Sequence, residues 1–284
     1  MKSLDDLIYD TRLATINKDT NNISDNEFVR YANDGQAKLQ SSIFQSYPES
    51  NIFAKEVFLS INVGQEAYSL PDDIYAQNAV VTLEISNSSI FFPLKRISDK
   101  ERRTGYGYIL RDKQFLLEPT PQNPVTNGVR LVYIRKLPTL DIRRGKITSF
   151  TSTSVNFTSD KFDASMIDNF FCVVDRDGVI KQSGLRIENY SAGVITTVGL
   201  TNAAAGDYLV LGSYCTTHSQ APDTCERYLF EYMNMRSMLR DSSQDAQSLA
   251  VMFKTVEDDI IGLFKNNVID SAQVPVSNTD YMIW

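Results

Sequence analysis

The chain has 284 residues, of which 42% are hydrophobic and 22% charged, with a formal net charge of −7. Enough apolar surface is present to offset the entropy of ordering, which excludes disorder throughout the chain. The excess of acids argues against wrapping nucleic acid by charge neutralisation. No apolar run reaches the roughly 18 residues of a membrane helix. Acids also stand where a signal peptide would be apolar, so we expect no membrane partner and assembly in a cytoplasm.

The first fifty residues predict two helices. A serine cap and an apolar stripe predict the first helix over residues 3–16. Ser24 and Glu27 have the spacing of a capping box and start a second helix. This helix is expected to end before Pro48, because the residue before a proline avoids the helical conformation.

From about residue 55 the hydrophobic period changes to two, which predicts strands. We expect a β-rich insertion over residues 55–145, interrupted by a short helix near 98–103, and a β-barrel or β-sandwich over 146–220. The stretch Asp175–Gly178 begins like a calcium loop but lacks the later acids and the distal Glu of an EF-hand. A hairpin turn is therefore the preferred interpretation.

Helical periodicity returns after Pro222 and gives two further helices up to residue 264. Short amphipathic helices cannot bury their apolar stripes alone. The predicted fold class is therefore α+β: residues 1–54 and 221–265 form one helical bundle, and the long β-rich region is inserted into it. Residues 266–284 have no helical period and predict an extended C-terminal arm.

The side-chain inventory argues against an enzyme. His218 is the one histidine, so a multi-histidine metal site is impossible. The three cysteines form no CxxC pair, and the chain has no glycine-rich phosphate loop. We expect no catalytic, cofactor-binding or metal-binding residues and no cofactor.

Two basic clusters and the arm are the candidate interface. Each basic cluster is either a solvated face or a contact with an acidic partner subunit or with phosphates. The arm carries large apolar residues on a mostly polar tether, which suits insertion into a neighbouring molecule better than folding back. The predicted interface residues are Lys100, Arg102, Arg103, Arg143, Arg144, Tyr281, Met282, Ile283 and Trp284.

The first 45 residues resemble the start of tailed-bacteriophage head-to-tail adaptor proteins. In that family a first helix and a polar linker precede a capped helix of the type S-D-x-E-[FIL]-x-x-[YF]-x-N-x-[GA]-Q. The matching residues are Ser24, Asp25, Glu27, Phe28, Tyr31, Asn33, Gly35 and Gln36. The chain is also similar to connector rings and tubular proteins of short-tailed phages, and its Asn-rich character is similar to adaptor rings of crAss-like phages.

The resemblance implies a structural virion protein, assembled in the host bacterial cytoplasm. Such a protein forms a ring of about twelve copies at the head–tail interface, between portal and tail, and lines the channel for DNA ejection. Its partners would be neighbouring copies, the portal protein, other tail or ring proteins, and passing genomic DNA without sequence-specific binding. The alternative from a different class is a β-rich tail-associated module that binds a receptor or glycan.

Overall fold

The computed structural model describes residues 1–14, 23–47, 51–87, 90–102, 105–159, 161–240 and 246–264. Within these residues the protein is mixed α and β, with four α-helices and several antiparallel sheets. This agrees with the helices predicted at both ends of the chain and the strands predicted between them. The helices are α1 (Leu4–Ala14), α2 (Asp25–Ser46), α3 (Glu226–Arg240) and α4 (Ala246–Leu263). None of the described helices is long and apolar enough to span a bilayer.

Helix α2 begins at the predicted capping box. The Ser24 hydroxyl accepts the Glu27 N–H, and the Glu27 carboxylate accepts the Ser24 N–H, both at 3.3 Å. These two bonds satisfy N–H groups that the first helical turn leaves without partners. The helix ends at Ser46, just before the predicted stop at Pro48.

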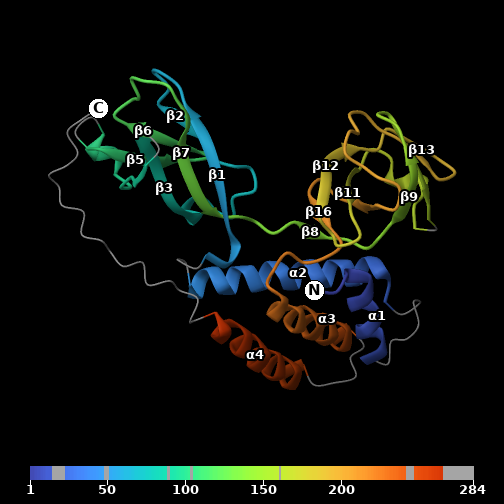
Figure 1. Cartoon of the computed structure of the whole chain (residues 1–284). Helices are drawn as coiled ribbons and strands as arrows, with labels where there is room; N and C mark the ends of the chain where they lie inside the picture. Colours follow the sequence, from blue (N-terminus) through green and yellow to red (C-terminus); the bar gives the residue numbers. More distant parts are fainter. Residues whose placement is uncertain are drawn as a thin grey trace.

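The four helices, here called the helical layer, share one hydrophobic core although they come from opposite ends of the sequence. Phe28 and Leu39 of α2 and Tyr228 and Met233 of α3 are fully buried in it. Gly35 permits this close approach, because a Cβ atom at that position would lie 2.8 Å from the Tyr232 ring. In Figure 1, α2 lies between the two β lobes and the helices α3 and α4.

Residues 51–134 form the first lobe, which contains two antiparallel sheets. One sheet has the order β1-β7-β3-β4 and the other the order β2-β6-β5. Leu83, Phe115 and Leu131 lie in the core between them. The strands are β1 (Ala54–Ile61), β2 (Ala67–Ser69), β3 (Val80–Asn87), β4 (Ile90–Pro93), β5 (Gly107–Arg111), β6 (Gln114–Glu118) and β7 (Val125–Ile134).

The short helix predicted near residues 98–103 is a single 3-10 turn over Asp99–Glu101. Its capping box, in which Ser98 and Glu101 pair, is present as the sequence indicated. The turn is short because the chain is already paired on both sides of it. Ile97 hydrogen-bonds to Tyr108 at 2.9 Å, so the intervening segment has to reverse direction within a few residues.

Residues 145–211 form the second lobe, a seven-stranded antiparallel sheet in the order β12-β11-β15-β9-β10-β14-β13. Phe171, Ile195 and Leu209 are fully buried in its separate core. The strands are β9 (Gly145–Phe150), β10 (Ser154–Thr158), β11 (Phe170–Val174), β12 (Ile180–Arg186), β13 (Asn189–Ser191), β14 (Val194–Thr196) and β15 (Tyr208–Leu211). Two short strands between the lobes and the helices, β8 (Thr139–Leu140) and β16 (Cys215–Thr216), pair in parallel.

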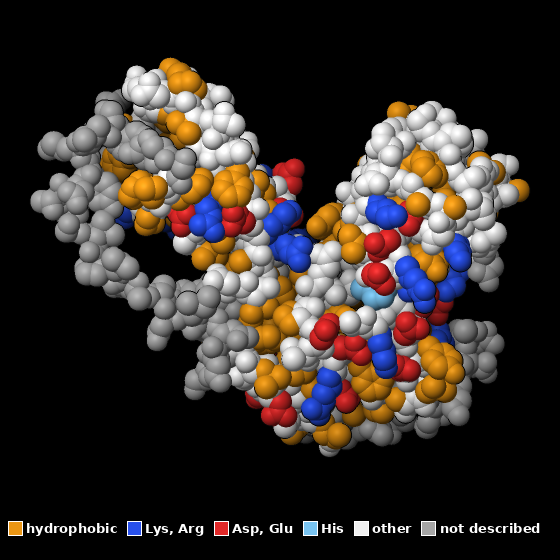
Figure 2. Space-filling model, viewed as in Figure 1, with side chains coloured by type: hydrophobic (Ala, Val, Ile, Leu, Met, Phe, Trp, Pro, Cys, Tyr) orange, Lys and Arg blue, Asp and Glu red, His pale blue; other side chains and the backbone are white. Residues whose placement is uncertain are grey.

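The hairpin predicted at Asp175–Gly178 is confirmed and joins β11 to β12. The Gly178 N–H donates to the Asp175 carbonyl at 3.2 Å, and Gly178 has a φ of +80°. A positive φ of this kind favours glycine, which explains the residue at this turn. Both lobes stand on the same side of α2 (Figure 1), and the space-filling view shows an open gap between them (Figure 2).

Candidate functional site

A stripe of amide side chains on α2 binds the chain that leaves the first lobe after β7. At one end Gln40 donates from Nε2 to the Arg135 carbonyl at 2.7 Å and accepts the Leu137 N–H at 3.3 Å. At the other end Asn33 accepts the Leu140 N–H at 2.7 Å and donates to the Leu140 carbonyl at 2.8 Å. Each amide therefore satisfies backbone groups as a neighbouring strand would.

Gln36 lies between these two amides and connects two segments. Its Nε2 donates to the Pro138 carbonyl at 2.8 Å, and its Oε1 accepts the Ser219 hydroxyl at 2.7 Å. Residues 33, 36 and 40 project from one face of a helix, since three and four residues span about one turn. We call these three side chains the amide ladder. Gln36 and Gln40 are buried and Asn33 is half-buried. Buried polar groups are costly to leave unpaired, so these amides fix the path of the chain between the lobes.

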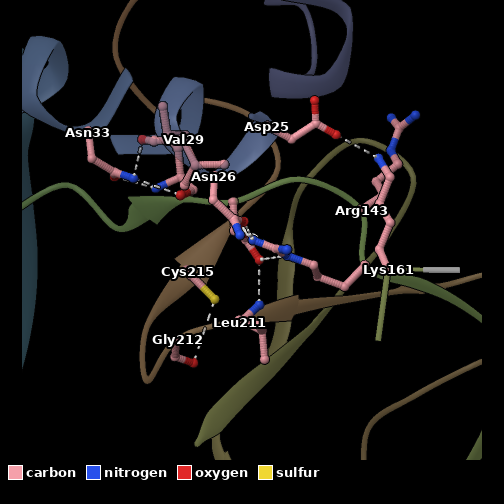
Figure 3. A network of polar contacts seen from close by, with 12 residues as sticks. Asp25, Asn26, Val29, Asn33, Arg143, Lys161, Leu211, Gly212 and Cys215 are labelled. Atoms are coloured by element: carbon pink, nitrogen blue, oxygen red, sulfur yellow. Dashed lines mark hydrogen bonds and ion pairs between the residues drawn. The ribbon is translucent and has the colours of Figure 1, made fainter. Parts of the chain in front are cut away.

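A buried ion pair continues the contact beyond the ladder. Asp141 and Arg144 are 3% and 8% exposed, and their charged groups lie 2.8 Å apart. Arg144 also donates to Asn26 of α2 at 2.7 Å, and Asp141 accepts the N–H of Leu211 from β15 at 2.7 Å (Figure 3). Burial raises the pKa of the Asp141 carboxyl, while Arg144 and the Leu211 N–H oppose that shift. This pair joins α2, the inter-lobe segment and the second lobe.

Charged contacts also hold the second lobe against the helical layer. The Lys161 ammonium lies 3.6 Å from Asp25 of α2 (Figure 3). It also lies 3.4 Å from Asp5 of α1. Asp5 in addition accepts the Arg143 N–H at 3.0 Å. The second lobe is therefore attached through ions and hydrogen bonds.

The first lobe is attached differently, by apolar packing. The rings of Phe44 on α2 and Tyr75 in the lobe meet edge to face, with centroids 5.2 Å apart. Phe53, Ala79 and Ile134 of this lobe are buried in the same cluster as the helices. Among the described residues, the strands of the second lobe contribute nothing to that cluster. The first lobe and the helical layer thus form one hydrophobic unit.

The motif at the start of α2 therefore has three structural roles. Ser24 and Glu27 begin the helix. Asn33 and Gln36 hold the inter-lobe segment. Gly35 leaves space for the ring of Tyr232 on α3. A pattern that places all three roles in one helix is far more specific than an amphipathic stripe.

The family model described as SU10 adaptor protein matches residues 2–152, which is more than half of the chain. The chain belongs to the SU10 adaptor protein family. The resemblance predicted from the first 45 residues is thereby confirmed. The matched region contains α1, α2, the first lobe and the inter-lobe segment, and it ends just after β9 in the second lobe. A comparison with curated proteins gives no match.

Membership of this family makes the protein a bacteriophage adaptor and a component of the virion. It also implies interaction with other phage structural proteins. The functional site of an adaptor consists of the surfaces that contact other proteins and of the internal contacts that hold those surfaces in position. The amide ladder and the buried ion pair are such a framework, because they set the position of both lobes on the helical layer.

The predicted interface residues of the first lobe differ in their surroundings. Lys100 is exposed in the 3-10 turn and has no ion pair within the described part of the chain. Arg102 is partly buried, and its guanidinium lies between the carboxylates of Glu66 and Glu118. Arg102 is therefore neutralised within its own lobe, whereas Lys100 is available to a partner.

The basic pair at the base of the second lobe is used mostly within the chain. The Arg143 guanidinium lies over the Tyr208 ring, 4.8 Å from its centroid. Arg144 faces Asp141 and Asn26 rather than solvent. The structure does not bring this pair together with the first cluster, since the two lie at different lobes. Arg103, Tyr281, Met282, Ile283 and Trp284 lie outside the described residues.

Of the candidate catalytic side chains, His218 is half-buried and the cysteines are buried. His218 contacts Thr217 through Nδ1 at 2.8 Å, and a Cβ atom at Gly178 would lie 2.4 Å from the same nitrogen. Burial, and then the Arg143 charge, lower the pKa of His218 below 6.5. Cys172 and Cys215 are fully buried, and the Cys172 thiol donates to the Gly212 carbonyl at 3.2 Å. The described residues contain no group of three or more potential metal ligands.

Neither the amide ladder nor the Asp141–Arg144 pair is predicted as a unit by the sequence. The signal was present in part: Asn26, Asn33, Gln36 and Gln40 recur with the same period as the apolar stripe beside them. Their partners are about a hundred residues away in the chain, and a single sequence does not connect the two.

Proposed function

We propose that this adaptor forms a closed ring between the portal and the tail of a tailed phage, and that the genome passes through its centre. By analogy with connector rings the number of copies would be about twelve, with heterologous contacts between neighbours. In this arrangement the helical layer is the bundle that makes the body of the ring. The two lobes project from it toward adjoining ring or tail proteins.

The observation that carries this proposal is the placement of the lobes. Helices from both ends of the chain form one layer, and both lobes rise from the same side of it (Figure 1). That arrangement leaves the flanks of the layer for neighbouring copies and one side for another component. Together with membership of the adaptor family it supports a connecting role. We propose in addition that the protein has no catalytic activity.

The distribution of charge supports passage of DNA. Residues 1–50 and 221–264 contain sixteen Asp and Glu against nine Lys and Arg, whereas residues 51–220 contain seventeen against eighteen. The negative excess of the chain thus belongs to the helical segments. Acidic walls repel phosphates and let a duplex move without being held.

Negative-stain imaging of the purified protein, alone and mixed with its portal protein, tests the ring. We expect closed rings of uniform diameter that stack on the portal. A protein that stays monomeric under both conditions would contradict the proposal. Binding of the monomer to an array of glycans would instead favour the receptor-binding alternative.

A second measurement tests the channel. Free duplex DNA should bind the rings only weakly at physiological salt. Micromolar binding with a steep dependence on salt would indicate that the protein grips DNA through many phosphate contacts, contrary to this proposal.

A further inference from the structure

An apolar groove opens at one end of the first lobe, where its two sheets separate. Its cavity volume is about 220 Å³. Ile61, Ile85, Leu94, Tyr106, Leu117 and Val125 form its apolar wall. Pockets for drug-sized ligands have volumes of about 300–1,000 Å³, so this groove suits one anchoring side chain rather than a small-molecule ligand.

One wall of the groove depends on a glycine. A Cβ atom at Gly107 would lie 2.1 Å from the Lys95 carbonyl oxygen, so no other residue fits without moving the backbone. Tyr108 on the next position donates its N–H to the same carbonyl at 3.0 Å. The segment that holds Leu94 and Lys95 is therefore fixed against β5, and the groove is a built feature of the lobe.

The surroundings of the groove are positively charged. Glu118 lines the groove, but Arg102 lies 4.0 Å from its carboxylate and offsets that charge. Lys95 and Arg96 follow the groove residue Leu94, are exposed, and have no ion pair within the part of the chain that the structure describes. Residues 93–113 hold seven Lys and Arg against three Asp and Glu. A matching occupant would carry large apolar side chains and an acid beside them.

We propose that this groove binds residues 279–284 of a neighbouring copy of the chain. That segment reads Thr-Asp-Tyr-Met-Ile-Trp and so combines one acid, Asp280, with four large apolar residues. Fourteen residues, 265–278, separate it from the last described residue, Phe264, a tether of up to about 46 Å at 3.3 Å per residue. An aromatic anchor in a pocket contributes more to an interface than most other contacts. The inference rests on the proposed ring, in which neighbours adjoin.

The first lobe does not need this segment to complete its own fold. Its core residues Leu83, Phe115 and Leu131 are buried by other residues of the lobe. The groove is thus an apolar surface that the folding of the lobe does not cover. A contact in which one copy supplies the segment and the next copy supplies the groove is heterologous, as closed rings require.

The experiment is photocrosslinking in the full-length protein. Benzoylphenylalanine replaces Trp284 in one population, which is mixed with an isotopically heavy population and assembled with the portal protein. Mass spectrometry of the product is expected to show light-to-heavy crosslinks from position 284 to residues of the groove such as Leu94, Tyr106 and Leu117. Crosslinks only within one copy, only to the portal, or only to another surface of the chain would overturn the inference.

Groove variants with matched controls sharpen the test. Tyr106→Ala and Lys95→Glu are expected to lower the light-to-heavy crosslink yield about tenfold or more. Phe150→Ala and Lys146→Glu are the controls, because Phe150 and Tyr106 are 37% and 39% exposed and both lysines are exposed. The controls should change the yield less than about twofold. Equal losses in groove and control variants would overturn the inference.

Circular dichroism establishes whether each variant is folded. If Tyr106→Ala does not fold, the surface variant Lys95→Glu still tests the groove. Imaging separates the two proposals. Normal rings without groove crosslinks would overturn this inference and leave the proposed function intact. A chain that never forms rings would overturn the proposed function, and the inference with it.

Discussion

The two β lobes are joined to the same helices by opposite kinds of contact. The first lobe packs Phe53, Ala79 and Ile134 into the core of the helical layer. The second lobe is held by the Asp141–Arg144 pair and by Lys161 between two carboxylates. Apolar burial is non-directional and is not screened by ions, whereas partly exposed ion pairs such as those of Lys161 weaken as salt rises.

This difference coincides with the extent of the family match. The matched residues 2–152 include the first lobe in full and stop early in the second lobe. The family model thus covers α1, α2 and the first lobe of the unit that shares a hydrophobic core, whereas α3 and α4 of that unit lie outside the match. A lobe with its own core and a polar attachment is the easier of the two to exchange without disturbing the rest of the fold.

Deleting residues 1–46 should produce the largest effect and should separate the two lobes. The deletion removes α1 and α2, so α3 and α4 lose the core that they share and are expected to unfold. The first lobe loses its apolar cover, while the second lobe keeps its own core. Hydrogen exchange should therefore show protection lost in residues 222–264 and in the first lobe, but retained in the second. A truncated chain with native helical circular dichroism and cooperative melting would contradict the shared core.

The substitution Asp141→Asn tests the polar attachment of the second lobe. It leaves the Arg144 charge buried without its partner, so we expect the free energy of unfolding to fall by about 3–5 kcal/mol in urea titration. Asp168→Asn is the matched control, because the Asp168–Arg186 pair has the same 2.8 Å separation but side chains that are 72% and 61% exposed. The control should change stability by less than about 1 kcal/mol. Equal losses of stability in the two variants would show that burial does not determine the contribution of the Asp141–Arg144 pair.

The substitution Gln40→Ala tests the end of the amide ladder nearest the first lobe. It leaves the Arg135 carbonyl and the Leu137 N–H without this partner, so the free energy of unfolding should fall by about 1–3 kcal/mol. Gln45→Ala in the same helix is the control, since Gln45 is exposed and, within the described residues, its side chain donates only to the Ser41 hydroxyl. Thermal melting of both variants gives the comparison, and an unchanged Gln40→Ala protein would mean that the apolar contacts alone hold this lobe.

A pH titration should give the smallest effect. It should act through His218, which lies against Gly178 in the hairpin of the second lobe. Burial first, and then Arg143, lower the pKa of His218 below 6.5, with Asp177 and Asp6 opposing. Between the folded and unfolded pKa values the unfolded chain binds more protons, so stability falls as the pH drops through this window. The melting temperature of His218→Gln should therefore decrease less than that of the unmodified protein between pH 7.5 and pH 5.5. A larger decrease in the variant would reverse the sign of this argument.

Local signals predicted much of the fold. The capping box at Ser24 and Glu27 and the turn at Gly178 depend on a few adjacent residues, and both are present as expected. The change of hydrophobic period near residue 55 likewise agrees with the start of β1 at Ala54. Such features can be predicted from the sequence because their physical cause lies within a few adjacent residues.

The framework of the site could not be predicted in the same way. Gln40 and Arg135 are 95 residues apart, and only the folded chain brings them together. Arg144 was assigned to an interface because a basic cluster in a sequence looks like a surface, whereas it is 8% exposed. Burial of a charge depends on partners such as Asn26 that lie far away in the sequence.

The shared core of the helical layer has a consequence for synthesis. Helix α2 leaves the ribosome early, but α3 begins only at Glu226. At about 5–20 residues per second, the apolar face of α2 waits on the order of ten to forty seconds for its partner. During this interval Phe28 and Leu39 lack the α3 side of their environment. An incomplete polypeptide therefore has no finished helical layer until α3 and α4 have been synthesised.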